Sequence, residues 1–193
     1  MKKFYFLLLL LISSFVYSQT NWSDSFLDSN FNQNPIWFGD TLSFIVNANK
    51  ELQLNAPAVS NKKIIQTPSQ AIWEASWEFS VKFDFNPSTN NYSRVYFASQ
   101  AGFQNGYYVQ LGGNSQDRIL LRTIENGLST TLIQSTDDWL DLSSVDVKIK
   151  VERNQQGVFN LSADTSGAYS TIGTAIDSTF YTSSVFGWEC IYT

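Results

Sequence analysis

The chain has 193 residues, of which 12 are lysine or arginine and 17 are aspartate or glutamate, so its formal net charge is −5 at pH 7. A protein this acidic is not expected to bind nucleic acid or anionic lipid, because both repel negative charge. The absence of histidine excludes Ser-His-Asp and Cys-His catalysis, and the single cysteine excludes an internal disulfide and a thiolate zinc site. Carboxylate chemistry, calcium binding and sugar recognition remain as candidate activities.

The first 18 residues have the pattern of a secretory signal peptide. Lys2 and Lys3 precede an apolar run over residues 4–16, and Val16-Tyr-Ser18 supplies a cleavage site. The run is too short to span a bilayer, which needs about 20 apolar residues. We therefore expect residues 1–18 to be removed and residues 19–193 to be secreted or displayed at the cell surface. The sequence has no second apolar segment, so no membrane insertion is expected.

The first third of the mature chain predicts short strands at residues 22–26, 44–46, 51–54 and 63–66. A longer strand follows over residues 73–85, where Trp77, Phe79 and Phe83 alternate with Glu74 and Glu78. A helix would mix these two sets on every face, whereas a strand separates them. One side of this strand is therefore expected to face the core and the other to face water or a ligand.

Later segments repeat this strand pattern. In residues 92–99, Val95 and Phe97 fall on one side and Arg94 and Tyr96 on the other. Further strands are predicted at residues 106–111, 118–123, 130–133, 145–152, 158–164 and 185–192. Many strands separated by polar turns, with no amphipathic helix, predict one antiparallel, two-sheet β-sandwich domain over residues 19–193. Cys190 in the last strand is expected to be a buried, small apolar residue.

Several segments resemble, in order, one family: Asp24-Ser-Phe-Leu-Asp28, Trp37-Phe-Gly-Asp40, Glu51-Leu-Gln-Leu-Asn55, Trp77-Glu-Phe-Ser-Val-Lys-Phe83 and Asn105-Gly-Tyr-Tyr-Val-Gln-Leu-Gly-Gly113. They are similar to the concanavalin A-like (laminin G-like) N-terminal modules of secreted proteins from gliding Gram-negative bacteria. Those proteins often carry lamin-tail domains and a type IX secretion signal. The resemblance implies a jelly-roll sandwich, export and further domains in a longer chain, and it implies no assigned reaction.

The resemblance also implies one more strand after the segment 186–192, paired beside the first strand at 22–26. The chain stops at Thr193, before such a strand. The expectation is therefore that the sandwich is incomplete at its C-terminus and that strand 22–26 lacks one neighbour.

Sugar binding requires an aromatic surface beside hydrogen-bonding groups on a rigid face. The off-core positions of the middle strands supply such residues, and we expect them to share one outer sheet face: Glu78, Arg94, Tyr96, Tyr108, Gln110 and Arg122. The sequence thus favours a non-catalytic module that binds glycan or another cell-surface polymer, or that mediates adhesion.

Two alternatives stay open. One is a structural spacer without a ligand. The other is a glycoside hydrolase that uses Glu74 and Glu78 as its paired carboxylates, although Ser76 stands where some related glucanases have an aspartate between them.

Calcium is a candidate cofactor, since hard cations take ligands from acidic loops. The candidate ligands fall into two groups: Asp24, Asp28 and Asp40, and Asp137, Asp138 and Asp141.

Overall fold

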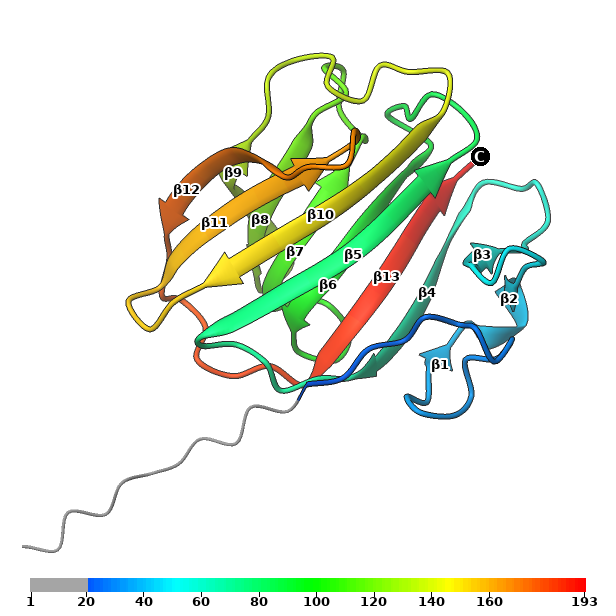
Figure 1. Ribbon diagram of the computed structural model, residues 1–193, viewed down its shortest axis with the longest axis horizontal. Helices are drawn as coiled ribbons and strands as arrows, with labels where there is room; N and C mark the ends of the chain where they lie inside the picture. The colour runs from blue at the N-terminus through cyan, green and yellow to red at the C-terminus, as the bar shows by residue number, and fades with distance from the viewer. Residues whose placement is uncertain (1–20) are drawn as a thin grey trace, which may run out of the picture.

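The alternating segments form two antiparallel sheets in the computed structural model, which describes residues 21–193 (Figure 1). The larger sheet has the order β1-β4-β13-β6-β7-β8-β9 and the smaller has the order β12-β11-β10-β5; β2 and β3 form a separate ribbon. The strand bounds are β1 Phe38–Gly39, β2 Phe44–Val46, β3 Leu52–Leu54, β4 Asn61–Pro68, β5 Ala75–Phe83, β6 Tyr92–Ser99, β7 Gly106–Leu111, β8 Ile119–Glu125, β9 Leu128–Gln134, β10 Val145–Arg153, β11 Val158–Asp164, β12 Ser170–Ile176 and β13 Val185–Tyr192, with a 3-10 turn η1 at Thr41–Ser43. The predicted all-β sandwich is confirmed.

The two sheets pack face to face through the apolar side of each strand. On β5, Trp77, Val81 and Phe83 are buried and Phe79 is half-buried, while the polar residues that alternate with them are exposed, which is the predicted alternation. Trp77 packs on Phe97 of β6, with ring centroids 4.8 Å apart. The main core lies between the sheets, so the outer face of each sheet is the side available to a ligand.

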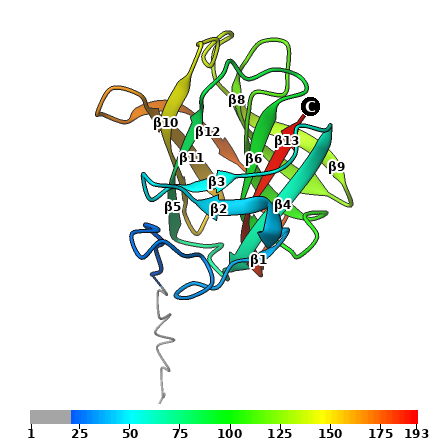
Figure 2. The ribbon, with the colours of Figure 1, turned by 90° about the vertical axis from the view of Figure 1, so that its right-hand side faces the viewer.

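The smaller sheet does not cover the β4 end of the larger one. There, the β2–β3 ribbon and the N-terminal segment cover the inner face of β4 and β13 instead (Figure 2). Trp37, Phe44, Ile65 and Cys190 form the centre of this second core. Cys190 is buried as predicted, and burial, followed by the charge of Glu189, raises the pKa of its thiol.

Two early strand predictions differ from the structure. Strand β5 begins at Ala75, because the backbone of Glu74 is left-handed with φ 47°, and the strand ends at Phe83. Residues 22–26 form no strand: Trp22 packs edge-on against Phe186, and the Asp24 carboxylate accepts hydrogen bonds from Phe26 N–H and Trp37 Nε1–H. The side chains of this segment, rather than its backbone, therefore attach it to the sandwich.

The predictions for the two ends of the chain agree with the structure only in part. Strand β13 lies between β4 and β6 and pairs with both, and residues 22–26 provide no strand beside which a further one was expected to pair. The short β1 and the edge strand β12 were not predicted. The predicted signal peptide, residues 1–18, lies outside the described residues. Within residues 21–193, no helix has the length and apolar character needed to cross a membrane.

Candidate functional site

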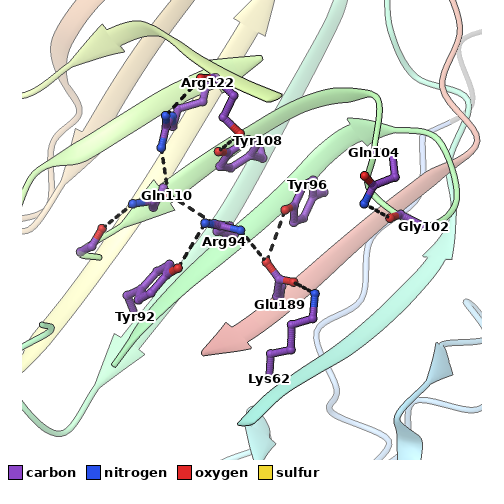
Figure 3. Close-up of polar contacts among 12 residues, drawn as sticks. Lys62, Tyr92, Arg94, Tyr96, Gly102, Gln104, Tyr108, Gln110, Arg122 and Glu189 are labelled. Carbon is purple, nitrogen blue, oxygen red and sulfur yellow. Dashed lines mark hydrogen bonds and ion pairs between the residues drawn. The ribbon is translucent and has the colours of Figure 1, made fainter. Parts of the chain in front are cut away.

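Five of the six predicted binding residues lie together on the outer face of the seven-stranded sheet (Figure 3). Arg94 and Tyr96 come from β6, Tyr108 and Gln110 from β7, and Arg122 from β8. The register places Arg94 opposite Gln110, and Tyr108 opposite Arg122. Because alternate residues of adjacent strands point to the same side, the strand alternation that buries Val95 and Val109 directs these polar side chains outward.

Glu78 is the exception, and its predicted place beside the other five is wrong. It lies on β5 in the four-stranded sheet, opposite Lys150 of β10, and its side chain interacts with Tyr169. The whole sandwich core separates it from Arg94. The strand face that was expected to hold Glu74 together with Glu78 is also interrupted, because Glu74 precedes β5 and has a left-handed backbone.

Arg94 is the centre of a hydrogen-bonded network on this face. Its Nη1 lies 3.1 Å from Glu189 Oε2, its Nη2 donates to the Tyr92 hydroxyl at 3.1 Å, and its Nε donates to Gln110 Oε1 at 3.3 Å. The guanidinium also lies 5.6 Å from the centre of the Tyr108 ring, within cation–π range. Contacts in several directions hold this side chain in one orientation.

Glu189 of β13 is the acidic member of the network, and it is not among the binding residues predicted from the sequence. Its side chain is only 4% exposed. Besides Arg94, its carboxylate accepts from Lys62 Nζ of β4 at 3.3 Å and from the Tyr96 hydroxyl at 3.3 Å. Burial, followed by the charge of Glu189, raises the pKa of Tyr96, so that hydroxyl remains a donor. The sequence does mark this residue, because Glu189 is an acidic residue between Trp188 and Cys190 in an otherwise apolar strand.

Gln110 extends the network toward β8. Its Oε1 accepts from Arg94 Nε and, at 3.4 Å, from Arg122 Nη1, while its Nε2 donates to the Gly112 carbonyl at 2.9 Å. Arg122 Nη2 donates to the Ser129 carbonyl at 3.4 Å. The strongest acceptors on this face are therefore already engaged by protein donors.

The two tyrosines do not form the open aromatic surface that sugar stacking requires. Tyr96 is 2% exposed and Tyr108 is fully buried. Phe103, from the loop between β6 and β7, stacks on Tyr96 with ring centroids 4.1 Å apart and an angle of 7° between the planes. Phe103 reaches this position across Gly187, where a Cβ atom would lie 2.3 Å from its Cζ. The predicted stacking role of these rings is incompatible with this arrangement.

An open groove lies beside the network, where the C-terminal end of β13 meets β4 and the start of β6. It has a volume of about 480 Å³. Its lining combines the charged side chains with two tyrosines and small polar groups: Ser60, Asn61, Lys62, Thr89, Asn90, Tyr92, Arg94, Glu189, Ile191, Tyr192 and Thr193. This groove is where a ligand can reach the Arg94 network from solvent.

Several of the aspartates predicted as calcium ligands are engaged in other contacts. The Asp40 carboxylate accepts from Ile64 N–H at 2.9 Å, Asp137 forms an ion pair with Arg118, and Asp141 accepts from Asn86 at 2.6 Å. In the described part of the chain, no three carboxylate, cysteine or histidine side chains are grouped as metal ligands would be. The six predicted aspartates therefore form no carboxylate cluster in the described part of the chain.

Solved structures share this fold at low sequence identity. The carbohydrate-binding module CBM66 from Bacillus subtilis aligns with a TM-score of 0.61 and 16% identity, over 80% of this chain and 87% of that chain. A point mutant of the Emp46p carbohydrate recognition domain aligns with a TM-score of 0.61 and 10% identity, over 89% and 91%. The exoplasmic/lumenal domain of VIP36, in a form bound to Ca²⁺ and Man3GlcNAc, aligns with a TM-score of 0.56 and 15% identity, over 82% and 76%.

No protein-family model matches the sequence, and no curated protein matches it either. The structural likeness gives the fold alone: the chain has the concanavalin A-like β-sandwich fold that these domains share.

Proposed function

We propose that this protein is a non-catalytic glycan-binding module and that its ligand binds in the groove beside Arg94. The observation that carries the proposal is the oriented polar network of Arg94, Glu189 and Lys62 at the floor of an open groove with Tyr92 and Tyr192 in its lining. Sugar rings bind where fixed hydrogen-bonding groups adjoin aromatic surface. The carbohydrate-binding names of the structural neighbours agree with this function.

The binding residues in this proposal differ in part from those predicted from sequence. Arg94 remains central, Gln110 accepts a hydrogen bond from it, and Arg122 donates to the same Gln110 oxygen. Tyr92 and Lys62 replace Tyr96 and Tyr108 as the groups that a ligand contacts, because Tyr96 and Tyr108 are buried. Glu78 has no part in this site, since it lies on the other sheet.

We further propose that the module acts outside the cytoplasm after removal of residues 1–18, within a longer protein of the secreted, lamin-tail type that the sequence resembles. A cell-surface polymer or a polysaccharide in the surroundings would then be its partner. Whether binding requires calcium is a separate test. Glycan binding should be measured with calcium and with a chelator. Loss of binding in the chelator would reveal a metal requirement that the positions of the described aspartates do not suggest.

The function is tested by a glycan array followed by calorimetry on the glycans that bind. Arg94→Ala and Tyr92→Ala should each abolish or strongly weaken binding. Lys148→Gln, an exposed change on the four-stranded sheet, should leave binding unchanged. Binding that survives both groove variants would place the site elsewhere, and the absence of any glycan ligand would favour the spacer.

A further inference from the structure

We propose that the groove selects an anionic glycan and binds a carboxylate or sulfate group of the sugar between Lys62 and Arg94. This inference rests on the proposed glycan-binding function and names the chemical class of its ligand. It follows from which hydrogen-bonding atoms of the groove are still free.

The charged acceptor of the groove is not available to a ligand. Both oxygens of Glu189 are engaged, one by Lys62 and the other by Arg94 and Tyr96, and the side chain is 4% exposed. Gln110 Oε1 behind it already accepts two bonds from arginines. A neutral sugar presents hydroxyl groups that must donate as well as accept, and among the side chains of the groove only neutral hydroxyl and amide oxygens remain to receive them.

The free hydrogen-bonding groups of Arg94, Lys62 and Tyr92 are donors. Each nitrogen of Arg94 donates one bond, which leaves one N–H on each terminal nitrogen for a ligand. The Lys62 side chain is 64% exposed and has one acceptor, Glu189, so two of its three N–H groups are free. The Tyr92 hydroxyl accepts from Arg94 and keeps its own proton to donate. Such an arrangement satisfies an anion better than a hydroxyl.

The charges of the groove side chains also favour an anionic ligand. The groove side chains include two cations and one buried carboxylate, on a chain whose net charge is −5. A polyanion would be repelled by most of the surface and attracted at this groove. Affinity would therefore depend on the specific cations of the groove and would weaken as salt concentration rises.

The test compares three oligosaccharides by calorimetry at low and at physiological ionic strength: one from alginate, which carries carboxylates, one from carrageenan, which carries sulfates, and one from laminarin, which is neutral. Alginate or carrageenan should bind more tightly than laminarin. A preference for alginate would identify a uronate as the ligand, and a preference for carrageenan would identify a sulfate ester. Equal or tighter binding of laminarin would overturn the inference and leave the proposed function intact, whereas binding of none of the three, together with an empty array, would remove both.

The matched variants are Lys62→Gln in the groove and Lys148→Gln on the opposite sheet. Both remove one exposed positive charge. Lys62→Gln should weaken anionic glycan binding by about fivefold at low ionic strength, the effect of one exposed ion pair, and should change laminarin binding little. Lys148→Gln should change neither, and equal losses in both variants would show nonspecific attraction and overturn the inference. Thr193 lines the groove, and the terminal carboxylate of the chain opposes an anionic ligand there. A chain extended by glycines carries this charge away from the groove and should bind the anion at least as tightly.

Discussion

Replacement of Glu189 by glutamine tests whether the buried carboxylate holds the outer face together. Glutamine keeps the size of the side chain and its oxygen, so Tyr96 can still donate to it, but Arg94 and Lys62 lose their counter-charge. Removing one partner of a fully buried ion pair costs about 3–5 kcal/mol. Arg94 is 27% exposed and Lys62 64% exposed, so water compensates part of the loss. We expect Glu189→Gln to lower the free energy of unfolding by about 2–3 kcal/mol.

The measurement is urea denaturation followed by tryptophan fluorescence, with thermal unfolding as a second readout. At about 2–4 °C per kcal/mol for a domain of this size, the melting temperature should fall by about 5–10 °C, without a change in the urea m-value. Lys62→Gln removes the same contact from its exposed side and should cost less than about 1 kcal/mol. If Glu189→Gln costs no more than Lys62→Gln, the buried carboxylate is not the stabilising centre of the network.

Three further changes test other parts of the sandwich. Arg153 is 2% exposed and donates to the carbonyls of three loop residues, so Arg153→Ala should cost at least about 3 kcal/mol in urea unfolding, and a smaller loss would contradict this role. Gly187→Ala should cost about 1–3 kcal/mol by displacing Phe103, but much less in a Phe103→Ala background; additive losses would disprove that contact. Partial burial, followed by the Glu78 charge, raises the pKa of Tyr169 to about 12 from 10.0, so its contribution to stability is present below pH 10 and lost toward pH 12. Tyr169→Phe should reduce that alkaline loss in pH-dependent melting, and an unchanged pH profile would disprove it.

The strands whose bounds the sequence predicts best are β6, β7, β11 and β13, and each of them lies between two neighbours in its sheet. Such strands are buried or half-buried along their length, so they carry the apolar and β-branched or aromatic residues that mark a strand in the sequence. Strand β12 was missed because it is an edge strand with few buried residues, and its pairing with β11 shifts register between Leu161 and Ser162. The segment 22–26 has strand-like residues, but its aromatic side chains pack on Trp37 and Phe186 without backbone pairing.

The sequence alone could place residues of the candidate site together only where their strands follow one another along the chain. Residues on β6, β7 and β8 are joined by short turns, so Arg94, Gln110 and Arg122 could be placed together from their phase alone. Glu78 could not be placed in this way, because the pairing of β5 with β10 connects segments about seventy residues apart, and alternation carries no information on which sheet a strand joins. Glu189 reaches the site through a pairing of the same kind, between β13 and β6.

The position of the open groove follows from how side chains cover the outer face of the seven-stranded sheet. Tyr96 and Tyr108 are large rings on adjacent strands, and an exposed apolar patch of this kind would be costly in water. The loop between β6 and β7 supplies Phe103 to cover them, and Gly187 leaves the space that this ring needs. Covering one end of the face leaves the charged end beside β4 and β13 open. A phenylalanine beside glycine in a short loop thus decides which part of the face a ligand can reach, and it does so through a contact that strand periodicity does not encode.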